Sequence, residues 1–84
     1  MLTAEQIRAA RALLRWEQRR LAEAAGVSLE TIKRLEGLTG PVSANTTTVS
    51  AIQAALEKAG VEIIPENGGG PGVRLAKKTK KAKR

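Results

Sequence analysis

Hydrophobic residues recur at intervals of three and four along most of the chain, which is the spacing of amphipathic helices. The first such run contains Ile7, Ala10, Leu13 and Leu14. The segment before it, Thr3-Ala4-Glu5-Gln6, fits a capping box, in which Thr3 accepts a hydrogen bond from the first turn and Gln6 reaches back. We therefore predict a helix over residues 4–14 whose apolar stripe faces the core.

Two shorter apolar patterns follow, separated by Gly26-Val27-Ser28. They predict helices over residues 18–25 and 29–36, the second closed by Gly37. Gly26 can take the left-handed conformation that ends a helix, and Ser28 is a good N-cap for the next one. Glu17, before the first of the two, is a poor cap. The inward residues are expected to be Leu21, Ala22, Ala25, Ile32 and Leu35.

The second half of the chain mixes helix and strand signals. Gly40-Pro41 cannot continue a helix, so residues 38–45 are predicted as a loop. A fourth helix is expected over 47–59, capped by Asn45, Thr46 or Thr47 and ended by Gly60. Its inward residues are expected to be Val49, Ile52, Leu56 and Ala59.

The short β-branched run Val61-Glu62-Ile63-Ile64 predicts a strand, and Val73-Arg74-Leu75 could return as its partner after a Gly-rich turn. A lone two-stranded hairpin is marginal, so it must pack on the helices or pair with another chain. The last residues, 76–84, are only Ala, Thr, Lys and Arg, and are expected to be disordered. The pattern divides the chain into a mainly α domain over 1–60, a hairpin over 61–75 that could serve for dimerisation, and a tail over 76–84.

The net charge of +7 is confined to the end of the chain. Acidic and basic residues balance before residue 74, so the folded part is neutral. The excess comes from Arg74, Lys77, Lys78, Lys80, Lys81, Lys83 and Arg84. From Lys77 onward these cations either add nonspecific phosphate affinity or form a solubility tail without a defined partner.

Composition argues against an enzyme. The chain has no His, Cys, Asp or Tyr, which removes the usual general bases, thiol nucleophiles and most metal ligands. Neither a cofactor nor a metal is expected, and Gly68-Gly69-Gly70-Pro71-Gly72 lacks the Lys-Ser/Thr of a phosphate loop. No run approaches the ~18 apolar residues of a membrane span, and none resembles a signal peptide. A soluble cytoplasmic protein is expected.

The turn at Gly26-Val27-Ser28 is the most informative feature, because two short helices joined by three residues have the geometry of a DNA-binding helix-turn-helix. Ala22 is small enough for the helices to cross closely, and Gly26 accepts positive φ without strain. Apolar residues lock the second helix in place: Val27, Ile32 and Leu35.

The segment WEQRRLAEAAGVSLETIKRLE, residues 16–36, resembles the helix-turn-helix of the Cro/phage-repressor-like (XRE) regulators, and the resemblance covers about residues 3–60. Family members usually carry Ser or Thr where Glu17 stands, and many have a fifth helix where Val61 to Leu75 stands here. The resemblance implies a lambda-repressor-like fold and a cytoplasmic transcriptional regulator of a bacterium, phage or prophage. Its partner would be double-stranded DNA, bound as a homodimer with half-sites about 34 Å apart.

In such a protein the 29–36 helix lies in the major groove. Base-edge contacts are expected from Leu29, Glu30, Thr31 and Arg34. Arg34 suits guanine, Glu30 suits the amino group of cytosine, and Leu29 or the Thr31 methyl suits thymine. Glu30 could instead form an ion pair with Arg34 on a solvated face.

Phosphate contacts are expected from a second set of residues: Gln18, Ser28, Lys33, Thr39, Asn45 and Thr47. Gln18 matches the family glutamine at the start of the second helix, and the alternative is an ordinary exposed residue there. Ser28 is mainly a cap. Thr39, Asn45 and Thr47 lie in the 38–47 segment, where phosphate binding and ordinary capping remain open alternatives.

Two further assignments are structural. Arg11 and Glu36 match family positions that form a partly buried ion pair, and the alternative is two unrelated surface charges. Trp16 is read as a core or hinge residue rather than a ligand platform.

Two other functions remain open. An antitoxin-like or adaptor module would bind a partner protein through the exposed edge of the 61–75 hairpin. Nonspecific nucleic-acid binding would depend on the basic tail alone.

Overall fold

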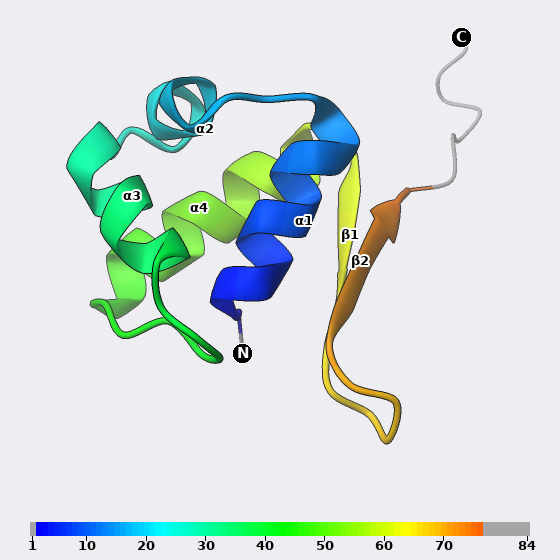
Figure 1. Cartoon of the computed structure of the whole chain (residues 1–84). Coiled ribbons are helices and arrows are strands. Elements are labelled where there is room, and N and C mark those ends of the chain that lie inside the picture. The colour runs from blue at the N-terminus through cyan, green and yellow to red at the C-terminus, as the bar shows by residue number, and fades with distance from the viewer. Residues whose placement is uncertain (1, 77–84) are drawn as a thin grey trace, which may run out of the picture.

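The computed structural model describes residues 2–76. These residues form four helices and a two-stranded antiparallel hairpin (Figure 1). In order they are α1 (Ala4–Leu14), α2 (Gln18–Ala25), α3 (Leu29–Glu36), α4 (Thr46–Lys58), β1 (Val61–Ile64) and β2 (Gly72–Leu75). Apart from Ala76, the segment expected to be a disordered tail lies outside the described residues.

Side-chain caps begin three of the helices, as the sequence indicates. Thr3 accepts from the backbone N–H of Gln6 at 3.0 Å, and the Gln6 side chain accepts from the backbone of Thr3 at 2.9 Å, which completes the capping box of α1. Ser28 caps α3, and Asn45 caps α4 by accepting from the N–H of Thr48 at 2.7 Å. Asn45 settles the choice among three candidate caps and starts α4 one residue earlier than predicted.

The turn between α2 and α3 is built on a left-handed glycine. Gly26 has φ of 71°, and its N–H donates to the last turn of α2. The following residue, Val27, donates to the carbonyl of Ala22 at 3.0 Å, which folds the chain back immediately. Ala22 is 4% exposed, and α2 packs on both α3 and α4.

The core lies between the helices and includes the first strand. Its largest fully buried side chains are Leu2, Ile7, Leu21, Ile32, Leu35, Ile52, Leu56 and Val61. Ala25, Val49 and Ala59, expected to face inward, are only half-buried, since all three lie near helix ends.

Leu13 does not face the core, and its expected inward placement is wrong. It is 38% exposed. Seven residues after Gln6, it lies on the side of α1 that faces the hairpin rather than on the central stripe.

The hairpin packs on α1 and α4, which is one of the two outcomes that the sequence allowed. Its register places Val61 opposite Leu75 and Ile64 opposite Gly72. The buried Gln6 side chain donates to the carbonyls of Ile64 at 2.8 Å and Gly72 at 3.0 Å. One residue therefore caps α1 and also fastens the hairpin to it.

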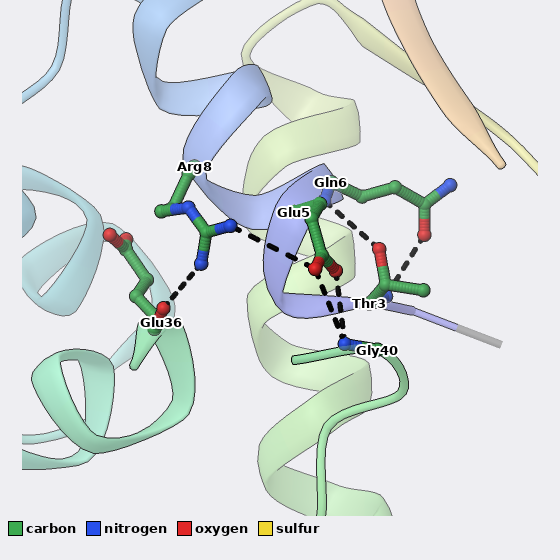
Figure 2. A network of polar contacts seen from close by, with 6 residues as sticks. All are labelled: Thr3, Glu5, Gln6, Arg8, Glu36 and Gly40. Atoms are coloured by element: carbon green, nitrogen blue, oxygen red, sulfur yellow. Dashed lines mark hydrogen bonds and ion pairs between the residues drawn. The ribbon is translucent and has the colours of Figure 1, made fainter. Parts of the chain in front are cut away.

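The segment that joins α3 to α4 is fastened to the start of α1 (Figure 2). Ala4 donates to the carbonyl of Gly40 at 2.9 Å, and the Glu5 carboxylate accepts from the Gly40 N–H at 3.1 Å. Hydrogen bonds from the backbone N–H groups of Glu5 and Gly40 hold the pKa of Glu5 below its ordinary value. Arg8 reaches from α1 to the backbone carbonyl of Glu36. These contacts hold the end of α3 and the segment after it against α1.

We expect Gly26→Ala to lower the free energy of unfolding by about 1 kcal/mol, because an L residue is strained at positive φ. A Cβ at Gly26 meets open space, so backbone strain is the only penalty. Gly37→Ala is the matched control, since Gly37 has φ of −80° and a Cβ there makes only ordinary contacts. Urea unfolding of both variants measures this, and equal effects would contradict the role given to Gly26.

A depressed pKa means that the charged form of Glu5 stabilises the fold above the ordinary carboxyl range and that this contribution is lost as the pH falls through the folded-state value. We expect Glu5→Gln to have a lower Tm than the wild type at neutral pH. The gap should narrow as the solution is acidified. Thermal unfolding between neutral and acidic pH tests this, and a constant gap would argue against the contact with Gly40.

Candidate nucleic-acid interface

α3 buries one side and presents the other to solvent. Ile32 and Leu35 are fully buried. Three of its charged residues are exposed, and two further candidates are half-buried: Glu30, Lys33 and Arg34, then Leu29 and Thr31. α3 lies on one side of the molecule and the hairpin on the opposite side (Figure 1). The expected base-contacting residues therefore share one helix whose outer face is open.

Two polar contacts shape the ends of that face. The Ser28 hydroxyl accepts from the N–H of Thr31 at 3.1 Å and donates to the Thr31 hydroxyl at 2.9 Å. At the other end, Arg34 donates to the carbonyl of Ser43 at 3.4 Å, which places its guanidinium beside the α3–α4 segment. Within residues 2–76, Glu30 and Arg34 form no ion pair, so neither charge is neutralised by the other.

A buried carboxylate ends α3. Glu36 is 5% exposed and accepts from Arg11 Nε at 2.6 Å and from Arg11 Nη2 at 2.8 Å. The remaining Arg11 nitrogen donates to the carbonyl of Trp16 at 2.8 Å. Hydrogen bonding to Glu36 raises the pKa of Arg11 above its ordinary value. Arg11 and Glu36 thus form a bidentate ion pair and are not unrelated surface charges.

Gln18, the first residue of α2, joins the same network. Its side-chain amide donates to Glu36 at 3.1 Å, and the residue is half-buried. The structure therefore gives Gln18 a partner at the end of α3 and does not leave it as an unconnected residue at a helix start. Because the amide has a second hydrogen and a carbonyl oxygen, it keeps capacity for another polar ligand.

The other expected phosphate contacts are exposed and come from separate elements. Ser28 and Lys33 belong to the α3 region, and Asn45 and Thr47 to the start of α4. Thr39 lies in the connecting segment. The Asn45 oxygen is engaged as a cap, whereas Thr47 has no capping role. The tail cations, Lys77 to Arg84, lie outside the described residues.

Trp16 packs against the core, as expected for a core or hinge residue, and the Arg20 guanidinium stacks 4.9 Å from the centre of its ring. Two other contacts had no local signal in the sequence. The links from Gln18 to Glu36 and from Arg34 to Ser43 join residues that no short motif relates. Charge and residue type made each group a candidate, but only the packing of the helices brings the pairs together.

No protein-family model matches this sequence, and no curated protein matches it either. None of the helices in the described part of the chain is long and apolar enough to cross a membrane. In that same part, no three His, Cys, Asp or Glu side chains gather as a metal site would require.

We expect Arg11→Met to lower the free energy of unfolding by about 3 kcal/mol, because it leaves the Glu36 carboxylate buried without its cation. Replacing both partners by Met should recover much of that loss. Arg74→Met removes an exposed ion pair instead and is the control, with a much smaller effect expected. Denaturant unfolding of the three variants measures the difference, and similar losses at Arg11 and Arg74 would contradict it.

Proposed function

We propose that this chain is a sequence-specific regulator that binds double-stranded DNA, of the Cro/phage-repressor-like type and with a lambda-repressor-like fold. α3 is the recognition helix, and α2 lies across the DNA backbone. The observation that carries the proposal is the tight turn between α2 and α3, with Gly26 at positive φ and Ala22 buried, together with the open outer face of α3.

Sequence is read from the exposed side of α3. Arg34 binds the acceptor edge of guanine, Glu30 accepts from cytosine, and Leu29 or the Thr31 methyl contacts thymine. Because Glu30 and Arg34 are not paired with each other in the described structure, neither must break an ion pair with the other before it reaches a base.

Phosphate contacts set the position of α3 in the groove without reading the sequence. Lys33, Ser28 and Gln18 contact the backbone beside the recognition helix, and Thr39, Asn45 and Thr47 do so from the next segment. The bond from Gln18 to Glu36 supports this arrangement, since it fixes the start of α2 relative to the end of α3. A phosphate contact at Gln18 therefore orients the recognition helix directly.

One short helix makes few base contacts, so the functional unit is a homodimer on a pseudo-palindromic site with half-sites about 34 Å apart. The basic tail adds affinity that is independent of sequence. Each phosphate that the tail neutralises steepens the plot of log affinity against log salt concentration by ~0.9. We place this activity in the cytoplasm of a bacterium, or of the host of a phage or prophage.

The second candidate is an antitoxin-like adaptor that binds a partner protein and DNA only secondarily. It is favoured by one observation, the exposure of Leu75 at the hairpin. Within that function, the hairpin and not α3 would be the primary contact surface.

Selection of bound duplexes from random DNA tests the proposal. The wild type should enrich a defined half-site, and Arg34→Ala should change the preferred base at one position. A bidentate arginine contact discriminates against the wrong base by about 1–3 kcal/mol. Lys77→Ala combined with Lys78→Ala is the matched control, and should weaken binding to all sequences alike while lowering the salt dependence.

Two outcomes would reject the proposal. The first is enrichment of no sequence by the wild type, and the second is loss of all binding when residues 76–84 are deleted. An unchanged preference in Arg34→Ala would reject the role given to that side chain.

A further inference from the structure

Among the described residues, no strand pairs with the outer edge of β2. Ala76 donates to the carbonyl of Gly60 at 2.7 Å, and the register sets these two residues opposite each other. Hydrogen-bonded and non-hydrogen-bonded pairs alternate in an antiparallel ladder. Arg74 and Gly72 are therefore bonded to β1, whereas the N–H and C=O groups of Val73 and Leu75 point away from it.

The two exposed large hydrophobic residues of the described structure lie beside this edge. Leu75 is 56% exposed although its partner Val61 is buried, and Leu13 is 38% exposed. α1 and β2 run in the same direction (Figure 1), and Gln6 touches Gly72. Leu13 lies about 10 Å beyond Gln6 along the helix, and Leu75 about 10 Å beyond Gly72 along the strand. Both leucines thus reach the same end of the hairpin.

The charges on the other face of the hairpin are mutually satisfied. Arg74 donates to the two carboxylate oxygens of Glu62 at 2.9 and 3.0 Å. This hydrogen bonding also keeps the pKa of the Glu62 carboxyl below its ordinary value. Within the two described strands this pairing leaves no unpaired charge, whereas exposed edges are commonly protected by one.

We propose that two copies of this chain associate through the outer edges of β2, antiparallel about a two-fold axis at Arg74, and form a continuous four-stranded sheet. In that register Val73 of each copy pairs with Leu75 of the other. The outward N–H and C=O groups of both residues are then all hydrogen-bonded across the interface. Leu13 and Leu75 of each copy are covered at the same junction.

The edge is self-complementary about Arg74, as a two-fold interface requires, because Val73 and Leu75 each offer one N–H and one C=O and the axis exchanges the two residues. The axis places Arg74 opposite the partner's Arg74, a like-charge contact that would oppose pairing. Each guanidinium is already held by Glu62 of its own copy, which relieves that repulsion. This inference rests on the proposed function, because DNA binding is the reason for the chain to form a dimer.

Single cysteines test the register, since the chain has none of its own. Across a non-hydrogen-bonded pair the Cα atoms lie about 4.5 Å apart, within the range of a disulfide. Arg74→Cys should therefore cross-link under mild oxidation. Glu62→Cys is the matched control, because it removes the same ion pair but lies three strand spacings, about 14 Å, from its copy.

We expect the Arg74→Cys dimer to form about tenfold faster than the Glu62→Cys dimer, because the interface holds the two thiols at high effective concentration. Light scattering of the wild type without DNA should show a concentration-dependent dimer, weakened by Leu75→Lys and unaffected by Ala24→Lys on α2. Equal cross-linking rates, faster cross-linking at Glu62, a wild type that stays monomeric, or a Leu75→Lys dimer as strong as the wild type would each overturn the proposal. If thermal unfolding shows that Leu75→Lys is not folded, the cross-linking rates of Arg74→Cys and Glu62→Cys still test the interface.

The interface and the DNA-binding function can fail separately. A cross-linked Arg74→Cys dimer that enriches no duplex from random DNA leaves the interface standing and rejects the function. A wild type that selects a defined site while Arg74→Cys cross-links no faster than its control rejects the interface and leaves the function.

Discussion

The buried carboxylate of Glu36 is the contact on which the arrangement of the helices depends. Arg11 from α1 neutralises it, and Gln18 at the start of α2 donates to it, so one side chain at the end of α3 holds all three helices. A buried charge is tolerated only when it is paired and hydrogen-bonded, and breaking such a pair is far more costly than losing an exposed one. The network therefore selects one relative placement of the first three helices.

That placement separates two surfaces. The charged side of α3 faces outward, and the hairpin packs on α1 and α4 on the opposite side of the molecule (Figure 1). Gln6 has a comparable role at the second surface, because it caps α1 and fastens both hairpin strands. The proposed DNA-reading face and the proposed dimer edge can therefore be occupied together without competing for the same residues.

Local chemistry was enough to predict much of the fold. Caps, periodicity and turn glycines are properties of neighbouring residues, so the helix bounds and the hairpin agree with the sequence to within a residue or so. Leu13 shows the limit: its spacing is that of a core residue, yet it is 38% exposed. At the candidate site, residue type and position were enough to predict Gln18 and Arg34 as candidates. Their partners Glu36 and Ser43 follow from helix packing, which no local pattern encodes.

Backbone amide chemical shifts, followed by NMR while duplex DNA is added at low ionic strength, test the central claim most directly. Low salt favours binding whatever the sequence, so no operator need be known. Our account predicts that the largest changes fall on residues 28–34 and on the starts of α2 and α4. Changes confined to residues 61–76, or to the tail alone, with α3 unaffected, would contradict it.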